Sequence, residues 1–291
     1  MPKCSVCQGS NVSQVYDSQI AADEKLSFSY TFSPLHNKTF AVYRCKQCSH
    51  QFCYPVPPDI GKNYLDVVDS EYLKHEESRR ATGAKSSAII KSYIKSGKLL
   101  DIGCATGEFL CAGHSDGLEC EGLEPSAWSG EIARKRGFRV HGELLETFAA
   151  KHRSEYDVVT LWGVIEHFSD PITEVARIQQ ILKPGGLLFV WTGDVDSITS
   201  RILGRRWWYW QGQHIQYFTF RSLKHLFSLN GLQTLSNKIY PFATSYQAIN
   251  NSLKRYKTHR LMTTLLKPFF VFKPMRFLYL PGEMLVVARK D

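Results

Sequence analysis

The sequence has no acidic residue between Ser197 and Gly282, although the whole chain contains 27 Asp and Glu residues and 36 Lys and Arg residues. Thirteen of the bases fall in that stretch, so the rest of the chain has 23 bases against 27 acids. The formal net charge of +9 is therefore a local property. A local excess of positive charge points to an anionic partner rather than to general solubility.

Apolar runs long enough to span a membrane are also missing, and the first residues, MPKCSVCQGS, contain no apolar core of a signal peptide. We therefore expect a cytoplasmic protein. With 291 residues, of which 43% are hydrophobic and 22% charged, the chain fits one large globular domain with a small appendage.

The sequence also lacks the usual phosphate-binding loops. A glycine turn does occur in the segment LLDIGCATGEFL, around Gly103 and Gly107. It has no Gly-Lys-Ser/Thr end, so it is not a P-loop. Two residues before Gly103, where the dinucleotide fingerprint has a glycine, stands Asp101. An acid at this place repels a diphosphate and favours a ligand with a cationic ammonium group.

Four of the eight cysteines form two Cys-x-x-Cys pairs, Cys4 with Cys7 and Cys45 with Cys48. Disulfides are not expected in a reducing compartment, and a thioredoxin-type redox site needs only one such pair. Two pairs can complete a tetrahedral shell of sulfurs around one Zn²⁺. We predict a structural zinc ribbon over residues 1–58, because so small a module buries too little apolar surface to fold without a metal.

Two other residues near the second pair, His50 and Cys53, are alternative ligands, although the regular pairs are preferred. The segments FSYTF and TFAVYRC between the pairs are typical of strands. A nucleic-acid-reading role for the module ranks lower, because no dense basic stripe accompanies it. The thiols of Cys104, Cys111 and Cys120 lie in apolar segments and are expected to be buried.

Beyond the cysteine module, strands and helices alternate with short links. A helical linker or cap over 59–97, with its helix at about 71–94, precedes five strand–helix units. This alternation predicts an α/β fold with a doubly wound parallel sheet. The expected strands are 98–102, 118–125, 138–141, 156–162 and 187–193, and GEMLVVARK is a final strand.

At this point the sequence resembles the class I S-adenosylmethionine-dependent methyltransferases. The matching segments are LLDIGCATGEF, GLEPS, YDVVTLWGVIEHFSDP and LKPGGLLFVWT, in the family's order. The resemblance implies a Rossmann-like seven-stranded domain over 98–291, interrupted by a basic insertion at 240–281. It also implies how the cofactor is bound. Asp101, Gly103, Cys104, Ala105 and Gly107 would surround the methionine part, Glu124 and Pro125 the ribose, Glu143 and Leu144 the adenine, and Trp162 and Gly163 the amino-acid end.

Methyl transfer requires alignment of the reacting groups and, for a hydroxyl acceptor, a base. His167, in VIEHFSDP, and His214, in GQHIQYFTF, are the candidate bases, and a structural role for His167 is an equal alternative. GQHIQYFTF also resembles a motif of sugar-nucleotide C-methyltransferases, in which His214, Tyr217 and Phe218 match. Gln213 replaces a glutamate of that motif, and a neutral amide is no base. We therefore favour O-methylation, with His214 as base and Tyr217 as a further catalytic residue.

The aromatic segment WWYWQGQ before His214 either lines a substrate pocket or packs in the core. Three roles compete for the insertion at 240–281: a lid over the substrate, an interfacial segment on anionic lipid, and a nucleic-acid surface. We rank them in that order.

The combined prediction is a methyltransferase that O-methylates a small anionic substrate, such as a nucleotide sugar, a glycan precursor or a lipid-linked intermediate. Transient contact with a membrane surface is possible for the insertion, and nucleic acid ranks below it as a partner. The alternatives are an RNA methyltransferase that uses the ribbon and the basic stretch, and a non-catalytic adaptor that binds the cofactor.

Overall fold

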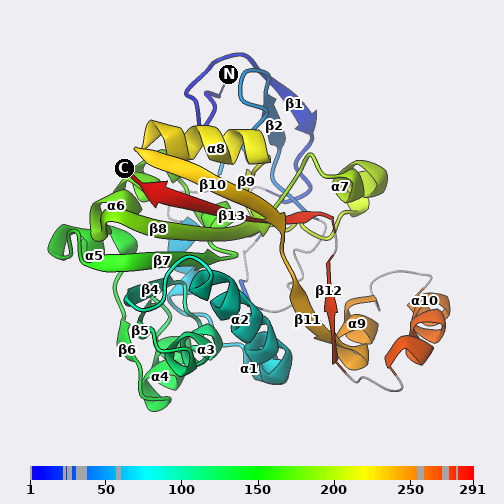
Figure 1. The fold of residues 1–291 in the computed structure, drawn as a ribbon. Helices are drawn as coiled ribbons and strands as arrows, with labels where there is room; N and C mark the ends of the chain where they lie inside the picture. Colours follow the sequence, from blue (N-terminus) through cyan, green and yellow to red (C-terminus); the bar gives the residue numbers. More distant parts are fainter. Residues whose placement is uncertain are drawn as a thin grey trace.

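A seven-stranded sheet forms the centre of the molecule in the computed structural model, which describes residues 2–21, 24, 28–30, 38–56, 60–253, 259–270, 275–279 and 281–291. The strand order is β10-β13-β8-β7-β4-β5-β6 (Figure 1). Strand β13 runs antiparallel to both of its neighbours, and the other pairings are parallel. The bounds are β4 Lys98–Ile102, β5 Glu119–Leu123, β6 Arg139–His141, β7 Tyr156–Trp162, β8 Leu182–Gly193, β10 Leu232–Ile239 and β13 Glu283–Lys290.

Successive residues of the central strands point to opposite faces of the sheet. Leu100, Val159 and Leu188 belong to one buried cluster, whereas Leu99 and Val158 belong to the other. Strands buried on both faces read as nearly continuous apolar runs, which is the pattern of YDVVTLW. The sequence therefore predicted β7 with its observed bounds.

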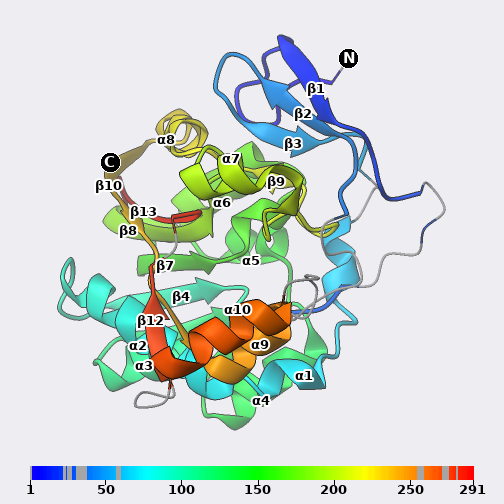
Figure 2. The same cartoon turned by 90° about the vertical axis from the view of Figure 1, so that its right-hand side faces the viewer.

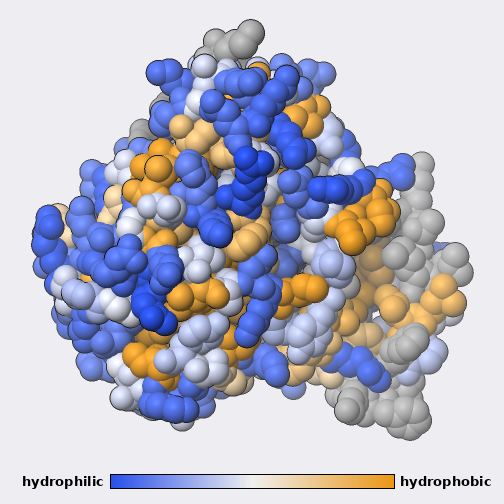
Figure 3. All heavy atoms as spheres, turned by 45° about the horizontal axis from the view of Figure 1, so that its top comes forward, coloured by the Kyte–Doolittle hydropathy of each residue, from blue (hydrophilic) through white to orange (hydrophobic). Residues whose placement is uncertain are grey.

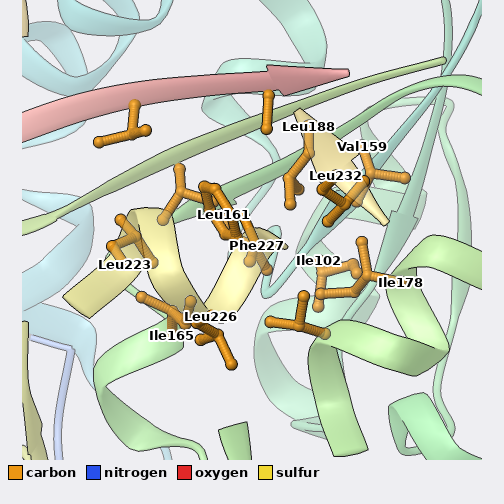
Figure 4. Close-up of a cluster of buried hydrophobic side chains, with 14 of the residues drawn as sticks. Ile102, Val159, Leu161, Ile165, Ile178, Leu188, Leu223, Leu226, Phe227 and Leu232 are labelled. Atoms are coloured by element: carbon orange, nitrogen blue, oxygen red, sulfur yellow. The ribbon is translucent and has the colours of Figure 1, made fainter. Parts of the chain in front are cut away.

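Helices cover both faces. One side holds α2 (Glu76–Lys91), α3 (Glu108–Ser115) and α4 (Ala127–Lys135), and the other holds α5 (Leu145–Lys151), α6 (Pro171–Ile181) and α8 (Phe220–Leu229). Figure 4 shows Ile178 of α6 and Leu223, Leu226 and Phe227 of α8 packed around sheet residues such as Leu161. Ser126 is the N-cap of α4, because its hydroxyl accepts a hydrogen bond from the Ser129 N–H.

The cysteine module has a sheet of its own, which residues from much later in the chain complete. Its order is β1 (Val12–Tyr16), β2 (Val42–Cys45), β3 (Gln51–Cys53) and β9 (Gln216–Tyr217). In Figure 2 the module stands at one corner of the molecule, with β9 beneath β3. Its buried residues belong to clusters shared with the rest of the chain, so the module is packed against the larger domain.

Several expected elements differ from the structure, and the strand expected at 187–193 begins earlier, at Leu182, as β8. The helix expected at 71–94 is divided into α1 (Ser70–Leu73) and α2, because the chain leaves helical geometry at His75, the N-cap of α2. Residues 28–30 of the expected strand FSYTF form no strand, and its last two residues lie outside the described part of the chain.

The basic insertion leaves the sheet after β10. Strand β11 (Phe242–Ser245) pairs antiparallel with β12 (Met275–Leu278), and α9 (Tyr246–Leu253), α10 (His259–Leu266) and the 3-10 turn η4 (Lys267–Phe270) lie between them (Figure 1). Four of its bases, Lys254, Arg255, Lys257 and Lys273, lie outside the described residues. The remaining short elements are η1 (Ile60–Tyr64), η2 (Ile165–His167), α7 (Ile198–Leu203) and η3 (Gly204–Arg206).

Among the described residues, no helix combines the length and the apolar character needed to cross a bilayer. On the face shown in Figure 3, apolar side chains form small separate patches among hydrophilic ones.

Candidate active site

A large cavity opens where the strand order reverses between β4 and β7, beyond the carboxyl ends of these strands. This is where open parallel sheets bind ligands. Its volume is about 1060 Å³. Its walls come from the glycine turn after β4, from α2, from the segment after β7, and from the aromatic segment before His214. Tyr240 and Phe242 at the base of the insertion close another side.

The glycine turn after β4 has a backbone that only glycine adopts without strain. Gly103 has a φ of 72° and Gly107, the N-cap of α3, a φ of 84°. A Cβ atom on Gly103 would lie 2.6 Å from a methyl group of Val164. At these glycines the backbone of the turn carries no side chain, so a ligand in the cavity can approach it closely.

Asp101, at the end of β4, lines the cavity and is buried. The Thr160 hydroxyl donates a hydrogen bond of 2.6 Å to its carboxylate. Burial raises the pKa of Asp101 to about 8, against the opposing effect of that bond. A cation placed beside this carboxyl group would lower its pKa and ionise it. An ammonium group is such a cation.

Glu124 follows β5 and is also buried. It accepts 2.9 Å hydrogen bonds from the backbone N–H groups of Ala105 and Ser126. The hydroxyl of Tyr30, from the segment between the two cysteine pairs, donates to the same carboxylate at 3.1 Å. The Glu124 carboxylate therefore accepts hydrogen bonds from two backbone N–H groups and one hydroxyl at the cavity wall.

The other residues predicted to bind the cofactor also line the cavity. Pro125, Glu143 and Leu144 lie on the wall formed after β5 and β6, and Cys104 and Ala105 belong to the glycine turn. The Cys104 thiol is buried against Gly122, and burial raises its pKa, so the side chain is a packing group as expected. All of these predicted residues, except Gly107, belong to the wall of one cavity.

Trp162 and Gly163 end β7 on the opposite wall. The Tyr240 ring stacks on Trp162 at 5.8 Å and on Trp191 at 4.8 Å between ring centroids. The buried indole N–H of Trp162 has no hydrogen-bond partner among the described residues. A buried donor without a partner costs stability, so it suits a ligand with an acceptor such as a carboxylate.

The donors present fit S-adenosylmethionine as a ligand. Asp101 matches its ammonium group, the Trp162 N–H matches its carboxylate, and Glu124 matches its ribose hydroxyls. The sulfonium is cationic, and carboxylates outnumber Lys and Arg among the described residues of the lining. The cavity thus has the charge and the hydrogen-bonding groups that the resemblance implied.

The two candidate bases meet in the cavity wall. The ring centroids of His167 and His214 are 4.9 Å apart. In each ring Nδ1 is the donor to a backbone carbonyl at 2.8 Å, that of Gln213 for His167 and that of Tyr209 for His214. With Nδ1 protonated, Nε2 is the acceptor nitrogen in both neutral rings.

Glu166, in the same VIEH segment, is a site residue that the sequence did not reveal. It is buried, accepts 3.0 Å from the Thr192 hydroxyl, and also accepts from the Tyr209 hydroxyl. Burial raises its pKa to about 7. Single atoms of Glu166, His167 and His214 lie within 4.8 Å of one another, so this group can share a proton or hold a metal.

Tyr217 is not part of the cavity lining among the described residues, contrary to its expected catalytic role. Its hydroxyl donates 3.3 Å to the carbonyl of Gln211, and its ring packs at 4.3 Å on Trp210 in the cluster of the cysteine module. Strand β9 turns this side chain away, because neighbouring residues of a strand face opposite sides.

The aromatic segment before His214 serves both of the roles considered for it. Trp208 and Tyr209 line the cavity, whereas Trp207 and Trp210 are buried in the cluster of the cysteine module. Other cavity residues belong to no sequence motif, so they were not predicted from the sequence. They include Tyr64, whose hydroxyl contacts Nδ1 of His167 at 3.0 Å, and Glu283, which accepts from the indole N–H groups of Trp191 and Trp208.

The four predicted metal ligands converge at the N-terminal end of the molecule. The Sγ atoms of Cys4 and Cys48 are 3.5 Å apart, as are those of Cys7 and Cys45, and all four lie within 4.8 Å of one another. A tetrahedral zinc–thiolate site has sulfurs about 3.8 Å apart, from Zn–S bonds of about 2.3 Å. A disulfide would need about 2.05 Å. The spacing fits one Zn²⁺.

The alternative ligands take other partners. His50 Nε2 is 2.8 Å from the side-chain oxygen of Gln216, and the Cys53 thiol faces the carbonyl of His214 at 3.8 Å. The regular pairs therefore form the sulfur cluster, as predicted.

Comparison with known proteins gives one family match, a methyltransferase domain, over residues 74–237. A ubiquinone biosynthesis O-methyltransferase of Thiobacillus denitrificans is 37% identical over 98 residues, which are 32% of this chain and 42% of that protein. The chain thus spans less than half of the length of this curated relative.

Two solved structures share the fold. A S-adenosylmethionine-dependent methyltransferase from Archaeoglobus fulgidus has a TM-score of 0.54 at 17% identity, covering 76% of this chain and 100% of its own. The 1,6-didemethyltoxoflavin-N1-methyltransferase of Burkholderia thailandensis, solved with bound 1,6-didemethyltoxoflavin and S-adenosylhomocysteine, has a TM-score of 0.52 at 14% identity and covers 84% of this chain and 97% of its own.

Proposed function

Because the chain belongs to the class I S-adenosylmethionine-dependent methyltransferases, we propose that it methylates a hydroxyl oxygen of a small molecule held in the cavity beside His214. The observation that carries this proposal is the geometry of His214. Its Nδ1–H is fixed on the Tyr209 carbonyl at 2.8 Å, so Nε2 is the nitrogen that can accept a proton in the cavity wall.

Different residues of the chain bind the cofactor and move the proton. When bound, the cofactor supplies a methyl group already activated by its sulfonium. Asp101 and Trp162 would hold the amino-acid end of this ligand and Glu124 its ribose, and the glycine turn would let the backbone approach it. Nε2 of His214 takes the proton of the acceptor hydroxyl. Glu166, with its pKa near 7, lies within reach to receive that proton afterwards.

Oxygen is favoured as the methylated atom for two reasons. Gln213 stands where a carboxylate base would be needed for carbanion chemistry, and its buried side-chain oxygen has no partner among the described residues. It is thus an acceptor for a substrate hydroxyl. The curated relative from Thiobacillus denitrificans is named as an O-methyltransferase, which supports the same atom.

The cavity lining favours a small substrate, and its side chains offer little positive charge for an anionic one. Apart from the cofactor region, the wall is aromatic, with Tyr64, Phe168, Trp208 and Phe242 among its residues. Of its described cations, Arg79 is paired with Glu108 at 2.8 Å. An acceptor with a flat apolar part fits this wall, and the anionic group expected from the sequence stays a prediction.

We also propose that Zn²⁺ binds Cys4, Cys7, Cys45 and Cys48 as a structural ion. Four thiolates leave no position for substrate, which is the mark of a structural site. The test is the metal content of purified protein. One zinc per chain, lost in Cys45→Ser, is expected; a metal-free, folded and active protein would contradict the assignment.

The reaction is tested by transfer of labelled methyl from S-adenosylmethionine into a cell extract, fractionated into nucleotide-sugar, lipid, aromatic small-molecule and RNA pools. Label in a small-molecule or lipid pool, absent with His214→Gln, supports the proposal. Label in RNA would overturn the small-molecule acceptor. Binding of the cofactor without label in any pool, repeated with extracts from several sources, would favour the adaptor.

A further inference from the structure

A third group of metal-ligating side chains lies outside the cysteine cluster and beside the cavity, whose wall includes one of its members, Glu143. It consists of His141 at the end of β6, Glu143 in the following loop, and His152, the C-cap of α5. One ligand atom from each residue lies within 4.8 Å of the other two. All three are half-buried, so the group is open to ions from solution.

Both histidine rings are oriented by a carboxylate. His141 Nε2 is 3.0 Å from Glu121, and His152 Nδ1 is 2.5 Å from Glu155. Histidines that bind metals commonly donate their second N–H to a carboxylate, which fixes the ring and makes the other nitrogen a better ligand. In this group the nitrogens left to bind a metal are Nδ1 of His141 and Nε2 of His152.

Packing fixes the rings further. The buried ring of Phe148 stacks on His152 at 4.1 Å and meets His141 edge-on at 4.8 Å. Lys98 pairs with Glu121 at 3.0 Å and with Glu155 at 2.5 Å, so it joins the two orienting carboxylates. The rings and their carboxylates therefore form one connected unit before any ion arrives.

The charge of Glu143 is already balanced by a lysine. Glu143 is paired with Lys151 at 2.6 Å, but the lysine side chain is 60% exposed and its ion pair is worth little in water. A divalent cation can displace it, because the ion gains two imidazole nitrogens as well as the carboxylate. Two nitrogens and one oxygen form a donor set that borderline transition metals prefer over Mg²⁺ or Ca²⁺.

We propose that His141, Glu143 and His152 form a binding site for a divalent transition metal of the Zn²⁺ type. Three protein ligands leave a coordination position for water, so the ion exchanges with solution, unlike one held by four cysteines. The ion takes no part in the proposed reaction, and the proposal does not rest on the proposed function. Glu143 also lines the cavity, so the ion would bind beside the adenine end of the site.

The test uses the full chain with zinc already bound at the cysteines and Co²⁺ as the probe. Equilibrium dialysis and visible absorption should show one further bound Co²⁺ with the weak bands of nitrogen and oxygen ligands and without thiolate charge transfer. His152→Gln should weaken this binding at least about tenfold, and Glu155→Gln, which removes an orienting carboxylate, by about 10–100-fold. His114→Gln, at an exposed histidine of α3, is the matched control and should bind as the wild type does.

Three results would overturn the proposal. The first is wild-type protein that takes up no Co²⁺ beyond the cysteine site, a result that does not depend on how any variant folds. Folded His152→Gln protein binding Co²⁺ as tightly as the control would exclude this group. Loss of the second ion in His214→Gln, with retention in His152→Gln, would place it in the cavity instead.

Discussion

His167 and His214 lie side by side in the cavity wall, yet their surroundings differ. Burial lowers the pKa of His167 to about 4, so its ring holds a proton poorly at neutral pH. Its Nδ1 is engaged by the Gln213 carbonyl, and the Tyr64 hydroxyl lies against the ring. We therefore propose His167 as a positioning residue for the segment that carries His214, and His214 remains the proposed base.

This assignment predicts the result of removing each side chain. His214→Gln should lower kcat by about 10²–10⁴-fold, the usual contribution of a general base, and leave cofactor affinity nearly unchanged. Tyr217→Phe, which removes a hydroxyl outside the cavity, is the matched control and should keep kcat within a few-fold. Steady-state kinetics with isothermal titration of the cofactor measure both. A large loss in Tyr217→Phe would restore the catalytic role expected from the sequence.

Asp101 gives a prediction that depends on pH. Its folded pKa is about 8, whereas an aspartate in an unfolded chain ionises near pH 4. Between these values the folded state binds the extra proton, so this residue lowers the free energy of unfolding as the pH rises through that window. Asp101→Asn cannot ionise, so without ligand it should be more stable than the wild type at pH 8 by about 1–3 kcal/mol.

Urea unfolding of both proteins at pH 5 and pH 8 measures this effect, because the difference between the two pH values isolates the ionisation of Asp101. The same variant should bind S-adenosylmethionine at least about tenfold more weakly, since a charged hydrogen bond contributes about 1.5–3 kcal/mol. Equal pH slopes for the two proteins would show that Asp101 is ionised in the folded state.

At the scale of elements, the segment 214–217 joins the cysteine module to the cavity. The backbone of Ile215 accepts from the Cys53 N–H at 2.9 Å and donates to the Glu166 carbonyl at 3.0 Å. The Gln216 side chain donates to the Phe168 carbonyl at 3.0 Å and accepts from Ser5 at 2.7 Å. His214 is thus held between β3 of the module and η2 of the larger domain.

Loss of the metal should therefore affect the reaction as well as the fold. Cys45→Ser, or treatment with a strong chelator, should lower the Tm and reduce kcat together, because β3 no longer orders the segment that carries His214. Thermal unfolding and methyl transfer on the same samples measure the two effects. Cys111→Ser, at a cysteine of α3 outside the sulfur cluster, is the control. Full kcat in a folded, zinc-free protein would show that the module does not position the base.

At the scale of the whole molecule, exposed apolar side chains and a basic side chain lie together on the segment after β8. Helix α7 exposes Ile198 by 69% and Ile202 by 77%, with Arg201 between them. The membrane contact expected from the sequence belongs to the insertion at 240–281 and stays a prediction. We propose α7 as a separate contact with anionic lipid. Co-sedimentation with anionic vesicles should fall as salt rises and should weaken in Ile202→Ser. Equal binding to neutral vesicles, or none to either, would contradict it.

Local pattern in the sequence predicted the layers of the fold and the cluster of four cysteines, and the resemblance to a family supplied the residues expected to surround the cofactor. Strand periodicity, glycine at positive φ and paired cysteines are properties of short segments, so they can be recognised without a tertiary structure. The resemblance to the methyltransferase family implied that Asp101, Glu124 and Trp162 share one site, and the carboxyl ends of parallel strands, which meet at one edge of the sheet, bring them there.

Only the tertiary structure decided what depends on burial and on contacts between distant segments. Glu166 became a candidate proton acceptor because its surroundings raise its pKa, and Tyr30 reached Glu124 across 94 residues of sequence. Tyr217 left the site because β9 joined the sheet of the cysteine module. Desolvation and strand pairing are set by neighbours in space, and the order of residues along the chain does not specify those neighbours locally.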